Sequence, residues 1–80
     1  MNIQLIQGEF EAADALNIIT QMIHVKIKYH EHKIGVLSNE EDIKSRESKI
    51  KRLQKDLFEI RQQIEQNVNK IKIQSTIEIL

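Results

Sequence analysis

The stretch Ala12–Tyr29, AADALNIITQMIHVKIKY, decides the fold, because its apolar side chains cover more of a helix than one neighbouring helix can bury. At about 100° per residue, these side chains fill an arc of roughly 200°, whereas a surface helix shows an apolar stripe of about 100° or a little more. One part of this arc predicts packing against a second helix of the same chain. The remainder predicts another cover, for which we expect a second copy of the chain.

The two parts of the arc assign different residues of the predicted helix 11–34. We expect the surface that binds a second copy to consist of Ile18, Met22, Val25 and Tyr29. We expect the core between the two helices to consist of Leu16, Ile19, Ile23, Ile27, Ile50, Leu53, Leu57, Ile60 and Ile64.

A second helix, predicted over 39–70, carries a heptad stripe, the pattern of residues that pack along one helix seam. The first core position is apolar in every repeat: Ile43, Ile50, Leu57, Ile64 and Ile71. The second core position is polar at both ends of the stripe: Arg46, Leu53, Ile60 and Asn67. The best-formed seam therefore runs from Ile50 to Ile64.

The segment between the helices predicts a tight turn. Gly35 suits the left-handed residue that follows a helix, so we expect the first helix to end at residue 34. Ser38 and Glu41 have the spacing of a capping box, which predicts the start of the second helix at about Asn39. So short a connection favours an antiparallel hairpin. The alternative is a parallel two-chain coiled coil, but the charges that flank the heptad stripe do not specify that pairing.

Both termini predict strands. At the N-terminus the pattern favours a strand over 2–7, although Ile6 interrupts the alternation, and Gly8 offers a bend after it. Near the C-terminus the isoleucines from residue 71 to residue 79 share one parity, which favours a strand over 72–79 and leaves a continued helix as the alternative. The predicted fold is a single domain, 1–80, mainly α: a coiled-coil-like hairpin with β-α-α-β order whose strands pair at the open end.

Composition limits the classes of function. The chain has 80 residues, 12 basic and 12 acidic side chains, and no cysteine. A chain of this size has a thin core and often needs disulfides, a metal or subunits, and here only subunits remain. Because a lone two-stranded ribbon is marginal in water, joining ribbons from two chains is a second argument for a dimer or larger homo-oligomer. We expect no membrane segment and no signal peptide, and therefore a cytoplasmic protein.

No motif predicts a catalytic, cofactor or metal site. His24, His30 and His32 point in different directions on a helix, so they do not converge on one ion within the chain. No glycine-rich phosphate loop or nucleophile motif is present. His30 and Lys26 point into the apolar arc, where the apolar contact narrows or a polar pocket forms near the hairpin tip.

Basic residues crowd the middle of the second helix and suggest a partner. The candidate contacts for an acidic protein surface are Lys44, Lys51, Arg52 and Lys55. A nucleic-acid-associated regulator using this basic band is the alternative, but the zero net charge and the lack of interleaved aromatic residues count against it. An ordinary solvated helix also explains the pattern.

The sequence therefore predicts a non-enzymatic, self-associating interaction module. An enzyme subunit that a different chain completes is a further alternative, which would need a shared polar pocket.

Overall fold

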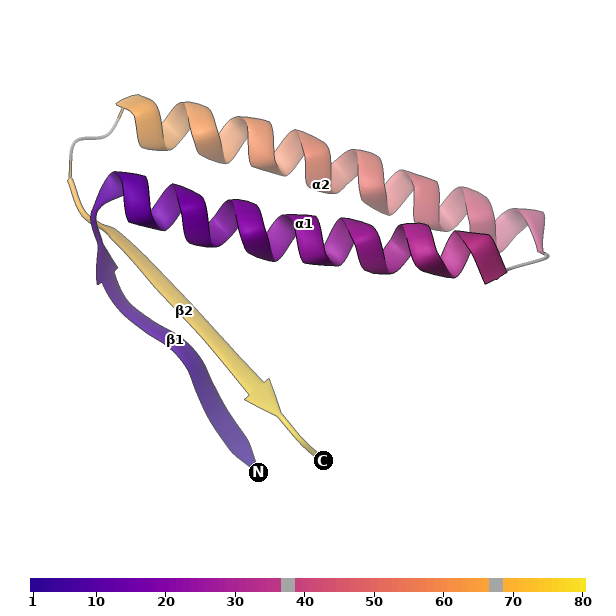
Figure 1. The fold of residues 1–80 in the computed structure, drawn as a ribbon, viewed down its shortest axis with the longest axis horizontal. Coiled ribbons are helices and arrows are strands. Elements are labelled where there is room, and N and C mark those ends of the chain that lie inside the picture. The colour runs from indigo at the N-terminus through magenta and orange to yellow at the C-terminus, as the bar shows by residue number, and fades with distance from the viewer. Residues whose placement is uncertain (37–38, 67–68) are drawn as a thin grey trace.

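The structure, a computed structural model, describes residues 1–36, 39–66 and 69–80. Four elements follow one another: β1 (Asn2–Phe10), α1 (Ala12–Val36), α2 (Glu40–Gln66) and β2 (Ile71–Glu78). The helices lie antiparallel as a hairpin, and the strands pair antiparallel as a two-stranded ribbon at its open end (Figure 1). This arrangement confirms the predicted fold class and its β-α-α-β order. The chain is a hairpin, not the parallel coiled coil considered as its rival.

The hairpin core is narrow, because each helix covers only one side of the other. Ala15 and Ile64 are the buried apolar residues among those that the structure describes. The residues expected in the helix–helix core are otherwise half-buried: Leu16, Ile19, Ile23, Ile27, Ile50, Leu53, Leu57 and Ile60. Spacings of three and four residues keep these side chains on the facing sides of α1 and α2.

The helix ends differ in part from the predicted bounds. The Asn39 side-chain Oδ1 accepts a hydrogen bond of 2.8 Å from the Glu41 N–H, so Asn39 caps α2. The expected cap, Ser38, lies outside the described residues. Helix α1 continues through Gly35 to Val36, so the prediction that this glycine ends the helix is wrong. Helix α2 ends at Gln66 and not at residue 70.

The ribbon has one apolar and one polar face, because residues paired across an antiparallel ladder point to the same side. The apolar face contains the pairs Phe10↔Ile71, Gly8↔Ile73, Ile6↔Ser75 and Ile3↔Ile77. The polar face contains the pairs Glu9↔Lys72, Gln7↔Gln74, Gln4↔Thr76 and Asn2↔Glu78. We call these two sides the apolar face and the polar face of the ribbon.

A bulge at Leu5 produces this separation. Gln4 and Ile6 pair with consecutive residues of β2, so Leu5 is one extra residue in β1. Without the extra residue, Ile6 and Gln4 would point to the same side of the strand. The bulge places Ile3 on the apolar face instead, and it accounts for the interrupted alternation in the sequence.

Strand β1 also runs three residues past its predicted end. Gly8 does not turn the chain; it lies inside the strand with a φ of 155° and pairs with Ile73. The Phe10 ring lies 3.9 Å from the position that a Cβ on Gly8 would occupy. Glycine therefore adopts a backbone conformation here that would be strained for a residue with a side chain, and the strand pairing continues through it.

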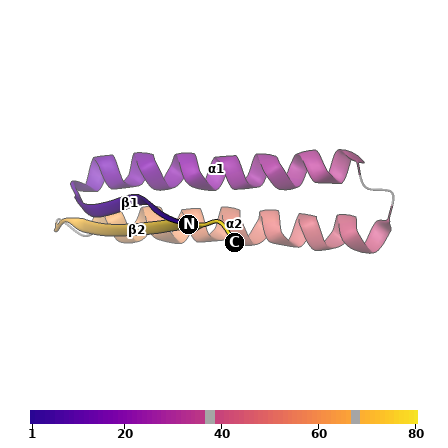
Figure 2. The ribbon, with the colours of Figure 1, turned by 90° about the horizontal axis from the view of Figure 1, so that it is seen from below.

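The ribbon diverges from the hairpin. Near residue 71 it touches the helices, and from there it projects outward so that both termini lie far from α1 and α2 (Figure 1). Seen from the ribbon side, the molecule is thin, and the ribbon extends from the open end of the hairpin toward the middle of the helix pair (Figure 2). The principal extents are 45 × 34 × 13 Å. A ribbon folded back over α1 would be another way to cover the excess apolar face of this helix, but Tyr29 on that face stays 51% exposed.

Candidate interaction surfaces

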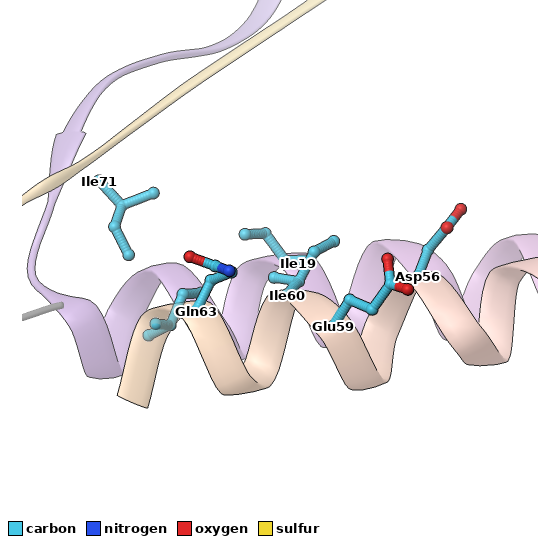
Figure 3. Close-up of a pocket in the computed structure, with 7 residues that line it drawn as sticks. Ile19, Asp56, Glu59, Ile60, Gln63 and Ile71 are labelled. Atoms are coloured by element: carbon cyan, nitrogen blue, oxygen red, sulfur yellow. The ribbon is translucent and has the colours of Figure 1, made fainter. Parts of the chain in front are cut away.

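An open groove lies where the ribbon leaves the helices. It has a volume of about 590 Å³ and is lined by Ile19, Asp56, Glu59, Ile60, Gln63, Ile64 and Ile71. Figure 3 shows Ile71 of β2 extending toward Ile19 and Gln63, with Asp56 and Glu59 farther along α2. The apolar face of the ribbon therefore faces the hairpin. The groove has an apolar floor and a carboxylate edge, which the sequence analysis did not identify.

The apolar surface expected to bind a second copy lies along α1. Ile18 is half-buried, and Met22, Val25 and Tyr29 are exposed to 39%, 68% and 51%. These residues, which we call the α1 strip, recur every three or four positions and so lie on one side of the helix. The chain thus leaves a continuous apolar strip in contact with water.

A cluster of Tyr29, His30 and Arg46 connects the two helices in the half of the hairpin away from the ribbon. His30 is buried at 6% exposure, and its Nδ1 accepts a hydrogen bond of 2.9 Å from Nη1 of Arg46. The Tyr29 ring meets the His30 ring edge-on with centroids 5.4 Å apart, and the Arg46 Cζ lies 5.4 Å from the Tyr29 centroid. The hydrogen bond joins α1 to α2 beside the half-buried Ile27 and Ile50.

The electrostatics of this cluster favour neutral His30. Burial lowers the pKa of His30 below its ordinary value of 6.5, and the charges of Arg46, Lys49 and Lys26 lower it further. An acceptor Nδ1 also requires the neutral imidazole, with its proton on Nε2. The sequence already placed His30 and Arg46 at core positions of facing helices. Their hydrogen bond gives each of these two polar groups a partner at a position where the sequence pattern favours an apolar residue.

The basic residues of α2 lie on exposed parts of the helix. Lys44 and Lys55 each lie near a carboxylate one turn away, at 3.6 Å from Glu40 and 4.0 Å from Glu59. Lys51 and Arg52 are exposed as well. Exposed ion pairs of this spacing contribute about 0.3–0.5 kcal/mol each, so these residues are available to a partner at little cost to the fold.

A second hollow lies on the same helix. Ser45, Ser48, Lys49 and Arg52 line it, and its volume is about 520 Å³. All of these side chains are exposed. The hollow presents two cations and two hydroxyl groups, which are suitable donors for an anionic group but do not enclose one.

The described residues show no cluster of side chains suited to hold a metal ion. No group of three His, Asp or Glu side chains converges within residues 1–36, 39–66 and 69–80. Neither α1 nor α2, as far as the structure describes them, is long and apolar enough to cross a membrane. No family model, curated protein or solved structure matches this chain. The surfaces themselves must therefore support any functional conclusion.

Proposed function

We propose that this chain is a non-enzymatic protein that self-associates through the α1 strip and acts as a protein–protein interaction module. The observation that carries the proposal is the surface area of the single chain, 6511 Å². A compact monomer of 9.4 kDa is expected to expose about 5,000 Å², so this chain exposes about 1,500 Å² more. Exposed apolar residues of the chain include Met22, Val25 and Tyr29 of the α1 strip and Ile3 and Ile77 of the ribbon.

The excess area fits a homodimer. If each chain buried about 1,500 Å², the interface would bury about 3,000 Å² in total, within the 2,000–5,000 Å² typical of obligate homodimers. The thin hairpin core supports the same conclusion, since a chain with two buried apolar residues among those described has little other source of stability. Cysteine is absent, which fits the reducing cytoplasm, where we place the protein.

The proposed interaction partner is an acidic protein surface. Lys44, Lys51, Arg52 and Lys55 lie on exposed parts of α2 and leave the α1 strip free for self-association. Charges at such a surface would mainly accelerate association and select partners of opposite sign.

A nucleic-acid-associated regulator is the second candidate, and the hollow lined by Lys49 and Arg52 is the observation that favours it. Binding to duplex DNA should then weaken as salt rises, with a log–log slope of about −0.9 for each phosphate neutralised. If neither duplex nor single strands bind at low salt, this second candidate is wrong.

The experiment for self-association compares two pairs of lysine substitutions on α1. Met22→Lys/Val25→Lys places two charges in the α1 strip, whereas Gln21→Lys/His24→Lys places them on exposed polar positions of the same helix. Each apolar side chain buried in an interface contributes about 1.5–3 kcal/mol, so we expect the first pair to weaken the dimer at least about 100-fold.

The readout is mass by light scattering over a dilution series, with helix content measured by circular dichroism. The Gln21→Lys/His24→Lys variant should keep the mass of the unsubstituted protein. Equal masses for the two variants, with both folded, would show that the α1 strip is not the interface.

A further inference from the structure

The outer edge of β2 carries a regular row of unpaired backbone groups. Met1 and Ile79 exchange two hydrogen bonds, 2.8 Å from the terminal amine to the Ile79 oxygen and 2.7 Å from the Ile79 N–H to the Met1 oxygen. Because hydrogen-bonding direction alternates along a strand, the odd-numbered residues of β2 direct their N–H and C=O toward β1. The even-numbered residues, Lys72 to Glu78, direct theirs away from it.

The two edges of the ribbon are not equivalent. Strand β1 contains the bulge at Leu5, which interrupts the regular spacing of its outer backbone groups. Strand β2 runs from Ile71 to Glu78 without a break. A free, unbroken edge is a template for another strand, so β2 is the edge suited to accept one.

The side chains of β2 are complementary to themselves about Ser75. If a second β2 lies antiparallel with Ser75 opposite Ser75, isoleucine meets isoleucine on the apolar face, since Ile73 faces Ile77 and Ile71 faces Ile79. On the polar face, Lys72 then faces Glu78 and Gln74 faces Thr76. Opposite charges that face one another across two strands stabilise antiparallel sheets, and β-branched side chains pack well on a half-buried sheet face.

The backbone agrees with this register. Ser75 directs its backbone groups toward β1, so Ser75 opposite Ser75 forms a non-hydrogen-bonded pair, in which Cα atoms lie about 4.5 Å apart. The outward groups of Gln74 then meet those of Thr76 in the second copy, and those of Lys72 meet those of Glu78. Every outward backbone group of β2 finds a partner.

We propose that β2 pairs with β2 of a second copy about a two-fold axis at Ser75, which joins the two ribbons into one sheet in the order β1-β2-β2-β1. This inference rests on the proposed self-association and names its second contact surface. The isoleucines of both strands form one continuous apolar face on the side of the hairpins. A four-stranded sheet also removes the instability of an isolated two-stranded ribbon.

Disulfide trapping tests the register directly, because the chain contains no cysteine of its own. In the Ser75→Cys variant, the two sulfur atoms lie at the axis, and a Cα separation of about 4.5 Å falls within the 4.4–6.8 Å of natural disulfides. We expect most of this variant to become a covalent dimer in oxidised glutathione. Ser45→Cys, exposed on α2, is the control for random collision and should stay mostly monomeric on a non-reducing gel.

A mixture of two further variants distinguishes this register from neighbouring ones. In a dimer of the Gln74→Cys variant, the two cysteines lie diagonally across the β2–β2 pair, about 7–8 Å apart, which is too far for an efficient disulfide. The same holds for a dimer of the Thr76→Cys variant. When mixed in equal amounts, the two variants should form a disulfide with each other, detected as the heterodimer mass by mass spectrometry. Both positions are exposed, so the substitutions should not disturb folding.

The outcomes separate this inference from the proposed function. If the reduced protein has the mass of a dimer but Ser75→Cys cross-links no faster than Ser45→Cys, and the mixture shows no preference for the heterodimer, the β2 contact is wrong and self-association stands. If the reduced protein has the mass of one chain, both proposals fail. Efficient cross-linking at Ser75 together with the heterodimer preference supports the two-fold axis.

Discussion

The two helices cover one another along most of their length, whereas the ribbon meets the helices at one end only (Figure 1). At that shared end Ala15 and Ile64 are buried, and Ile71 is half-buried beside them. At the free end, the apolar face of the ribbon continues with Ile3, Ile77 and Ile79, whose exposed fractions are 43%, 41% and 54%. One ribbon thus has two halves of similar composition and different burial.

This difference shows which surfaces the chain covers by itself. Alternating isoleucines are typical of a strand with one buried face. The proximal half of the ribbon buries that face partly against the hairpin, but the distal half finds no cover within the described chain. The same holds for α1, whose inner side packs on α2 while the α1 strip stays exposed. The proposed second copy would cover both surfaces.

The largest expected effect comes from comparing an isoleucine buried where the hairpin meets the ribbon with an isoleucine at the free end of the ribbon. Ile64→Ala should lower the free energy of unfolding by about 2–3 kcal/mol, because it empties the best-buried apolar site where hairpin and ribbon meet. Ile77→Ala should cost far less in dilute protein, where its side chain is partly in water. Chemical denaturation at low concentration measures both values.

The Ile64→Ala and Ile77→Ala variants should also differ in how their stability depends on protein concentration. If a second copy covers the distal ribbon, the cost of Ile77→Ala should rise with protein concentration, since stability then includes association. An equal cost for Ile64→Ala and Ile77→Ala in the dilute, monomeric state would break the distinction between the two halves.

Replacing the two glycines should have an effect of intermediate size on the free energy of unfolding, with opposite signs in the ribbon and in the hairpin. Gly8→Ala should destabilise by about 1 kcal/mol or more, because its φ of 155° is unfavourable for a residue with a side chain. Gly35→Ala should stabilise by up to about 1 kcal/mol, because Gly35 is helical and an added Cβ meets nothing within 4 Å. Thermal unfolding of both variants measures the difference. A loss of stability in Gly35→Ala would contradict its placement inside α1.

The smallest expected effect is a pH dependence of the hairpin. His30 has a pKa lowered by burial and then by Arg46, Lys49 and Lys26, so the unfolded chain binds its proton more readily than the folded chain. Its contribution to stability is present above pH 6.5 and is lost as the pH falls through 6.5 toward the folded pKa. His30→Gln should therefore flatten the decline in melting temperature between pH 7.5 and 5.5. The exposed His24→Gln is the control, and a flattening there of the same size would argue against His30 as the source.

The hairpin could be predicted from the sequence because its signals are long and repeated. The heptad stripe from Ile43 to Ile64 extends over several turns, so one irregular residue does not change its direction. The parity of the isoleucines likewise predicted a strand over 72–79, and the structure places β2 one residue earlier, over Ile71–Glu78. Periodicity of this kind depends only on the backbone geometry of one element.

The remaining features depend on contacts between elements. The bulge at Leu5 exists only in relation to the register of β2, which β1 alone does not encode. Asn39 and Ser38 are both good capping residues, so the sequence alone does not decide between them. His30 and Arg46 each interrupt an apolar pattern in the sequence. Only the packing of the two helices brings Nη1 of Arg46 to 2.9 Å from Nδ1 of His30. The angle of the ribbon to the helices, which opens the groove, has no local signal.

The mass of the unsubstituted chain in solution tests the central claim most directly, namely that one copy cannot cover its own apolar surface. By light scattering at high micromolar concentration, we expect a mass at least twice the 9.4 kDa of one chain, with full helix content. A folded protein with the mass of a single chain under those conditions would contradict it.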